Sequence, residues 1–109
     1  MASKESNVVD FNITPDRARK LIKEIAEDSS RVIFTAHAEK RMRQRKISRI
    51  QVMRCLTHGR VIEGPAPSIK GNWEMKMEVM SAGEIVTVVV ALEKDDAGNY
   101  AVIITVFGA

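Results

Sequence analysis

The chain has 109 residues, of which 45% are hydrophobic and 28% charged, and its formal net charge is +3 at pH 7. This length predicts one domain, and this composition excludes collagen-like, low-complexity and disulfide-stapled proteins. Cys55 is the single cysteine, no apolar run approaches the ~20 residues that span a bilayer, and the polar N-terminus does not resemble a signal peptide. We therefore expect a cytoplasmic protein without a membrane partner.

The positive charge is concentrated in residues 31–60. This segment holds nine basic residues and one acidic residue, Glu39, which gives it a net charge of +8, so the rest of the chain carries −5. Charge separated in this way favours a polyanionic partner, and nucleic acid is the first candidate. The alternative interpretation is a solvated helix face that is rich in Lys and Arg.

Helices are predicted in the first half of the chain, after a tail or extended arm over residues 1–13. Thr14 is a good N-cap and Pro15 suits the first helical turn. Ser48 caps the last of these helices, and Gly59 is expected to end it in a left-handed conformation. The predicted elements are a helix over 15–28, a short strand over 31–35, a helix over 36–46 and a helix over 49–58.

The second half of the chain carries strand patterns. The predicted strands cover residues 60–63, 72–80, 84–93 and 100–107. The stretch Gly64–Asn72 is the longest irregular segment, and we expect it to be mobile. The order predicts an α+β fold in which an N-terminal helix and a β-α-α unit precede a four-stranded antiparallel meander. The helices are expected to pack on one sheet, as a single domain over residues 14–109.

Candidate site residues lie on the second predicted helix. His37, Arg41 and Arg45 are four residues apart, so they align along one helix face. Ala38 and Met42 mark the face that meets the core, and a turn of ~100° per residue places the three residues along the border of that face. These three residues are named the His-Arg-Arg stripe.

The composition of the stripe suits cleavage of RNA by its own 2′-hydroxyl group. Histidine moves protons near neutral pH, and the guanidinium fork suits phosphate. Together they supply proton transfer and stabilise a pentacoordinate phosphate without a metal or another cofactor. The alternative is architectural, with His37 bracing the strand–helix corner and Arg45 paired with a carboxylate such as Glu63, Glu74 or Glu78.

The segment FTAHAEKRMRQRKIS, followed by VMRCLTHGRVIEG, resembles a family of small uncharacterised bacterial domains. The shared signature runs His-Ala, two residues, Arg-Met, two residues, Arg, and then Ile-Ser. That family is grouped with RelE/ParE-like toxins and the wider barnase–colicin–RelE ribonuclease superfamily. The resemblance implies two helices on a four-stranded antiparallel sheet, metal-independent endoribonuclease activity, and His37, Arg41 and Arg45 as the catalytic residues. It also implies a protein antitoxin or inhibitor as a partner.

RNA is the expected partner, and six of the other basic residues of the +8 segment are the expected contacts to it. The apolar C-terminal strand departs from better-known RelE-type toxins, which carry basic and aromatic residues there. One alternative function is a non-catalytic nucleic-acid-binding or regulatory module. Another is a protein-interaction partner in a toxin–antitoxin or mobile-element system. The predicted nucleic-acid contacts are Lys40, Arg43, Lys46, Arg49, Arg54 and Arg60.

Three further patterns in the sequence suggest a metal site, a helix-turn-helix and a base-stacking residue. Cys55 and His58 have C-x-x-H spacing, but a structural zinc site needs about four ligands, so no metal site is predicted. The two short helices also suggest a helix-turn-helix with Arg49 and Gln51 as base readers. Trp73 suits either the core or base stacking, and its alternating strand favours the core.

Overall fold

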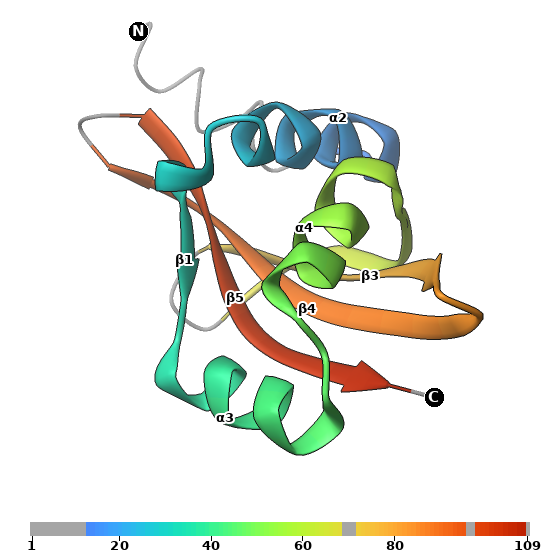
Figure 1. The fold of residues 1–109 in the computed structure, drawn as a ribbon. Helices are drawn as coiled ribbons and strands as arrows, with labels where there is room; N and C mark the ends of the chain where they lie inside the picture. Colours follow the sequence, from blue (N-terminus) through green and yellow to red (C-terminus); the bar gives the residue numbers. More distant parts are fainter. Residues whose placement is uncertain (1–12, 69–71, 96–97, 109) are drawn as a thin grey trace, which may run out of the picture.

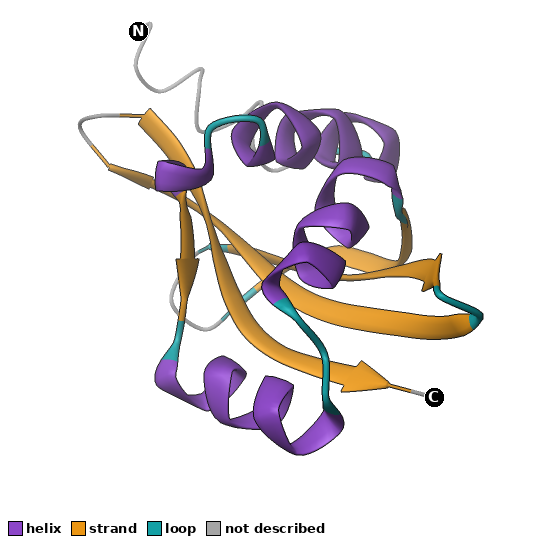
Figure 2. Cartoon of the chain, viewed as in Figure 1, coloured by secondary structure: helices purple, strands orange, loops and turns teal. Residues whose placement is uncertain are grey.

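In the described part of the chain, two helices cover one face of a five-stranded sheet and a third helix flanks it (Figures 1 and 2). The computed structural model describes residues 13–68, 72–95 and 98–108. The helices are α2 (Pro15–Ala26), the 3₁₀-helix η1 (Ser29–Arg31), α3 (Ala36–Arg45) and α4 (Arg49–His58). The strands are β1 (Val32–Phe34), β2 (Arg60–Pro67), β3 (Trp73–Ser81), β4 (Glu84–Asp95) and β5 (Gly98–Gly108).

Side-chain caps fix where the helices begin. Thr14 Oγ1 accepts a hydrogen bond from Arg17 N at 3.1 Å and starts α2. Ser48 and Gln51 form a capping box at the start of α4, because each side chain accepts from the other residue's backbone N–H. These bonds satisfy N–H groups that a helix start otherwise leaves unpaired. All three predicted helix starts are therefore confirmed.

The strands form one mixed sheet in the order β1-β5-β4-β3-β2. Strands β2 to β5 form the predicted antiparallel meander, and the sheet confirms the α+β class. The β3–β4 hairpin turns through Ala82 and Gly83, which both have positive φ angles, 54° and 82°, as a two-residue hairpin turn of the favoured hand requires.

Successive side chains of each strand point to opposite sides of the sheet, so the sheet has two different faces. Helices α2 and α4 pack on one face, where the side chains of the central strands are fully buried (Figure 2). The other face has no helix over it in the described part of the chain, and we name it the uncovered face. The buried strand residues of the helix-covered face are Val32, Met75, Met77, Val86, Val88, Val90, Leu92, Ala101, Ile103 and Val106.

The first strand pairs in a way that the resemblance did not imply. The resemblance implied a four-stranded antiparallel sheet, but the predicted short strand becomes a fifth strand, β1, which runs parallel to β5 with Phe34 opposite Ile103. The guanidinium of Arg31 donates to Asn99 O at 2.9 and 2.6 Å and ties the start of β1 to β5. Arg31 therefore has an architectural partner.

Helix α2 ends two residues earlier than predicted, at Ala26. Asp28 leaves the helix because its carboxylate accepts from Ser30 Oγ at 2.7 Å and Ser30 N at 3.2 Å, which caps η1. The same hydroxyl and backbone bonds hold the pKa of the Asp28 carboxyl below its ordinary value.

Strand β2 is longer than predicted and continues from Arg60 to Pro67. The predicted loop over Gly64–Asn72 is correspondingly shorter, and residues 69–71 lie outside the described residues, so the expectation of mobility there stays a prediction. Pro65 and Pro67 are tolerated because β2 is an edge strand and needs no N–H on its outer side. Two register shifts accompany them.

Gly59 is extended, with φ −81° and ψ −178°, and not left-handed as predicted. Glycine is required there for a different reason. A Cβ at Gly59 would lie 2.4 Å from Cys55 O and 2.6 Å from Glu78 O. The end of α4 can therefore approach the backbone of β3 only without a side chain at this position.

Candidate nucleic-acid interface

Helix α3 lies beside the C-terminal half of β5, past the point where β1 ends (Figure 1). Thr35 fixes this position, because its hydroxyl accepts from Ala38 N at 3.0 Å and donates to Ile103 O at 2.9 Å. The side chains of Ala38 and Met42 are buried. The strand–helix corner is thus braced by Thr35, and not by His37 as the architectural alternative proposed.

The His-Arg-Arg stripe lies on the side of α3 that borders the uncovered face. Glu39, on the other side of the helix, reaches Arg49 of α4 in the helix layer at 3.7 Å. His37 and Arg41 are each two residues from Glu39, a rotation of about 200°, so they lie on nearly the opposite side of α3. Helical rise separates neighbouring members of the stripe by about 6 Å.

The stripe is accessible and free of carboxylates. His37 and Arg45 are exposed, and Arg41 is partly buried. Arg41 Nη1 is 3.5 Å from Gln44 Oε1, and no ion pair joins any stripe residue to another described residue. Two of the three sheet carboxylates considered as partners of Arg45 have cations of their own, because Glu78 binds Arg60 and Glu63 binds Lys76. Glu74 forms no ion pair with Arg45 or with any other described residue.

The uncovered face carries a row of unlike side chains across four strands. In register, Arg60 of β2 lies opposite Glu78 of β3, Glu78 opposite Thr87 of β4, and Thr87 opposite Phe107 of β5. Lys76 Nζ lies 5.9 Å from the centre of the Phe107 ring. The row therefore brings an aromatic ring, a hydroxyl, a carboxylate and two cations onto one surface.

Apolar side chains surround this row. Met80 is 59% exposed, Ile85 41% and Phe107 38%, and Ile33 at the β1 edge is 46% exposed. Sequence reasoning did not select Phe107, Thr87 or Lys76 as site residues. The alternation of β3 predicted which of its side chains leave the core, but only the register across four strands shows that these residues share one surface.

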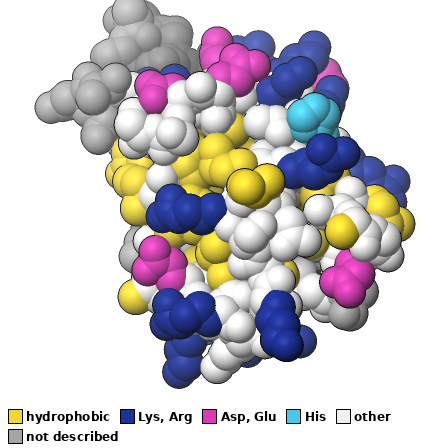
Figure 3. All heavy atoms as spheres, in the orientation of Figure 1, with side chains coloured by type: hydrophobic (Ala, Val, Ile, Leu, Met, Phe, Trp, Pro, Cys, Tyr) yellow, Lys and Arg dark blue, Asp and Glu magenta, His cyan; other side chains and the backbone are white. Residues whose placement is uncertain are grey.

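The predicted nucleic-acid contacts do not form one surface. Arg60 is tied to Glu78 on the uncovered face by bonds of 3.0 and 2.7 Å. Arg49 lies over the Phe34 ring, 4.0 Å from its centre, in the helix layer. Arg54 is exposed on α4. The other three, Lys40, Arg43 and Lys46, are exposed on α3 and at its end, where Lys and Arg side chains gather at the bottom of Figure 3.

Two hollows open on the described surface. One, of about 390 Å³, is lined by His58, Arg60, Glu78, Val79, Met80 and Ile85. The other, of about 440 Å³, is lined by Glu39, Met42, Arg43, Lys46, Ile47, Ser48 and Arg49. His58 Nδ1 lies 2.8 Å from the Thr57 hydroxyl, so its partner is a side chain and not the helix carbonyl that its position suggests.

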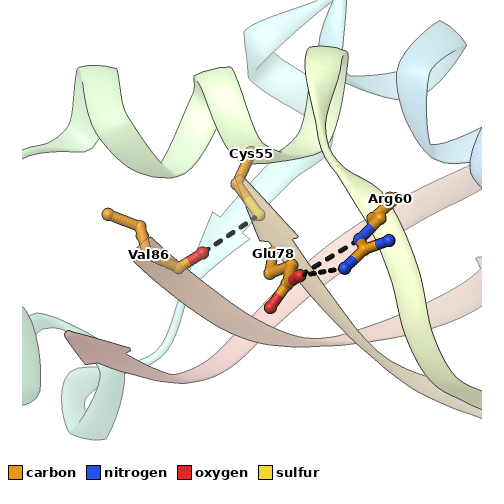
Figure 4. A network of polar contacts seen from close by, with 4 residues as sticks. All are labelled: Cys55, Arg60, Glu78 and Val86. Atoms are coloured by element: carbon orange, nitrogen blue, oxygen red, sulfur yellow. Dashed lines mark hydrogen bonds and ion pairs between the residues drawn. The ribbon is translucent and has the colours of Figure 1, made fainter. Parts of the chain in front are cut away.

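Cys55 belongs to the core. Its thiol lies under α4 with Sγ 3.9 Å from Val86 O, beside the Arg60–Glu78 pair (Figure 4). Burial, together with the charge of Glu78, raises the pKa of the Cys55 thiol to about 12. No group of metal-ligating side chains gathers anywhere in residues 13–68, 72–95 and 98–108. The thiol is therefore held neutral and away from solvent.

The helix-turn-helix interpretation does not fit the packing. Helix α3 packs on β5, whereas α4 packs on α2, β3 and β4. The Gln51 side chain, considered as a base reader, is engaged in the cap of α4. Trp73 is partly buried and packs against the core, as its strand pattern favoured.

Comparison with protein families places residues 34–108 in a domain of unknown function, DUF4258. The chain belongs to this family. The matched segment includes the whole signature that the sequence resemblance rested on, and it confirms a small uncharacterised domain. The match carries no RelE/ParE or barnase assignment. Neither the curated proteins nor the solved structures gave a match. No helix in the part of the chain that the structure describes is long and apolar enough to cross a membrane.

Proposed function

We propose that this protein binds single-stranded RNA between the His-Arg-Arg stripe and the uncovered face of the sheet, and that it cleaves the strand there. The observation that carries the proposal is the position of the stripe. Two arginines and a histidine without carboxylate partners border a face with an exposed aromatic ring. The resemblance of the signature to RelE/ParE-like ribonucleases agrees with this proposal but does not carry it.

The two parts of the surface bind different parts of the strand. Arg41 and Arg45 donate hydrogen bonds to phosphate oxygens, for which the guanidinium fork is well suited. Phe107 offers a ring on which a base stacks, and stacking of this kind accepts any base. The apolar surface around Phe107 extends the contact for a single strand, whose bases are free to leave their own stack.

The cleavage step uses the 2′-hydroxyl of the substrate. His37 takes the proton of that hydroxyl, and the oxygen attacks the adjacent phosphorus. The bond to the 5′-oxygen breaks, water gives a proton to the leaving oxygen, and the resulting hydroxide takes the proton from His37, so that a 2′,3′-cyclic phosphate remains. Arg41 and Arg45 stabilise the added charge on the pentacoordinate phosphate. A protein inhibitor of this reaction would act by covering the same face.

The test uses purified protein, a labelled single-stranded RNA, and EDTA in the buffer. The wild-type protein should cleave the RNA, and His37→Ala should lose ~10²–10⁴-fold in rate while it keeps most of the affinity. Lys23→Ala, which removes an exposed positive charge from α2, is the matched control and should cleave normally.

The same measurements separate the alternatives. Binding by the stripe without cleavage identifies a non-catalytic nucleic-acid-binding module. If single-stranded RNA binds no better to the wild-type protein than to the double variant Arg41→Ala/Arg45→Ala, the proposal is wrong in both parts.

A further inference from the structure

The second hollow lies on the far side of α3 from the His-Arg-Arg stripe. It has a volume of about 440 Å³ and lies between the end of α3 and the start of α4. Met42 and Ile47, which are buried, form its base. Glu39 lines it as well, and Glu39 is opposite the stripe on α3. The hollow is thus a separate surface from the proposed cleavage site.

Lys46 lines this hollow in a backbone conformation that suits glycine. Its φ angle is 58° and its ψ angle 43°, which is the left-handed region, at the residue that ends α3. Glycine takes this conformation without strain, and it is the usual residue at such helix ends. Unusual conformations of other residues concentrate at functional sites.

Three cations from three parts of the chain line the hollow. Arg43 comes from α3, Lys46 from the connection, and Arg49 from α4. The side chains of Arg43 and Lys46 have no hydrogen-bond or ion-pair partner among the described residues. Arg49 contacts Glu39 only at 3.7 Å, and exposed pairs of this kind are weak. With Glu39 counted, the lining carries a net charge of +2.

The side chains, and not the helix terminus, supply this charge. Ser48 and Gln51 already form the capping box of α4. Arg49 is positioned by the Phe34 ring, 4.0 Å from its guanidinium carbon. Guanidinium groups on two helices and an ammonium between them can surround a tetrahedral anion from separate directions.

We propose that this hollow binds a doubly charged phosphate, and that its natural ligand is the terminal 5′-phosphate of an RNA strand. A phosphate monoester carries up to two negative charges near neutral pH, which matches the net +2, whereas an internal phosphodiester carries one. The choice of RNA as the source rests on the proposed function. A helix with its side chains is about 10–12 Å across, and a short single strand spans that distance from the stripe to the hollow.

The experiment compares one RNA sequence with a 5′-phosphate and with a 5′-hydroxyl, by fluorescence anisotropy under conditions in which the strand stays intact. The wild-type protein should bind the phosphorylated strand about tenfold more tightly, the gain of one charge-assisted contact. Lys46→Gly should abolish this preference without loss of stability, because glycine suits the backbone. Lys46→Gln, which keeps a side chain, should behave like Lys46→Gly in binding.

Two matched variants sharpen the result. Glu39→Gln removes the one carboxylate that lines the hollow among the described residues and should increase the preference for the 5′-phosphate. Lys23→Ala removes an exposed cation from α2, outside the hollow, and should leave the preference unchanged. Equal affinity of the wild-type protein for the two strands, or a preference that survives Lys46→Gly, overturns the assignment to an RNA end.

A titration with inorganic phosphate, followed by NMR, separates this inference from the proposed function. Chemical-shift changes confined to Arg43, Lys46 and Arg49 support the phosphate site. If the same protein binds no RNA, the phosphate site stands and the proposed function is wrong. RNA binding through the stripe, with no shift at these residues and no 5′-phosphate preference, leaves the proposed function standing and refutes the phosphate site.

Discussion

Glu78 accepts two hydrogen bonds from the Arg60 guanidinium through the same carboxylate oxygen, at 3.0 and 2.7 Å. The sequence placed Arg60 in a segment of free positive charge, but in the fold its charge is balanced on the neighbouring strand. Arg60→Ala should therefore weaken RNA binding by less than Arg41→Ala does. Because the pair is largely exposed on the arginine side, we expect a stability loss of ~1 kcal/mol, measured by urea denaturation. A larger loss of RNA affinity than in Arg41→Ala would show that Arg60 contacts the strand.

Arg41 should contribute to affinity through charge. Each phosphate contact to a single strand adds about 0.7 to the slope of log affinity against log salt, so Arg41→Ala should lower that slope by about this amount. Arg45 is better tested with Arg45→Lys, which keeps the charge and loses the planar fork. That variant should keep the slope and lose cleavage rate. An unchanged slope in Arg41→Ala would contradict phosphate contact.

Phe107 should bind bases through its ring. The residue is 38% exposed on the uncovered face, so more than half of its surface is buried and Phe107→Ala would also destabilise the fold. Phe107→Leu keeps an apolar side chain there and removes the ring. Stacking on such a ring is worth ~1–3 kcal/mol per base, and we expect Phe107→Leu to lose affinity in that range with a melting temperature close to that of the wild-type protein. Ile50→Ala, which truncates an exposed residue on α4, is the control and should bind RNA normally.

Cys55 should be unreactive in the native state and should couple stability to alkaline pH. Burial raises the pKa of its thiol from 9.0 to about 12, so the folded state holds the proton more tightly than the unfolded state does. This contribution to the free energy of unfolding is complete below pH 9 and is lost as the pH rises toward 12. The difference in stability between the wild-type protein and Cys55→Ala should shrink over that interval in denaturation measured at several pH values. A constant difference would show that the thiol is not held neutral by the fold.

Gly59 should not tolerate a side chain. Both atoms that a Cβ would approach, Cys55 O and Glu78 O, belong to the backbone, so neither can move without shifting α4 or β3. Gly59→Ala should destabilise the protein by ~2–4 kcal/mol, measured by chemical denaturation. Gly83→Ala adds a Cβ where nothing lies within 4 Å but where φ is positive, so it measures backbone strain without a clash. Gly59, whose φ is −81°, has the clash without that strain, and a larger loss in Gly59→Ala supports the steric cause.

Local chemistry made the helices predictable. Thr14, Thr35 and Ser48 each cap a helix, and a cap acts within four residues of its own position. The stripe could be predicted for the same reason, because helical periodicity alone aligns His37, Arg41 and Arg45.

Pairing between distant segments could not be predicted in this way. The parallel contact of β1 with β5 joins residues nearly 70 positions apart through a strand of three residues. The Arg60–Glu78 pair and the position of Phe107 depend on register across the sheet. Pro65 and Pro67 predict that the strand has ended, because proline has no N–H for pairing within a sheet. The strand continues through them only because β2 lies at the edge of the sheet, and the sequence does not show that position.

The irregular β2 also limits how these molecules can associate. Pro65 and Pro67 offer no N–H to a neighbouring chain, and register shifts interrupt the strand between Val61 and Ala66. At the opposite edge, β1 offers only three residues. A sheet that exposes apolar side chains on one face invites stacking into fibrils when its edges are long and regular. Here neither edge offers a long, regular row of backbone groups to a further strand, so the protein can expose apolar side chains on one face without becoming prone to aggregation through its edges.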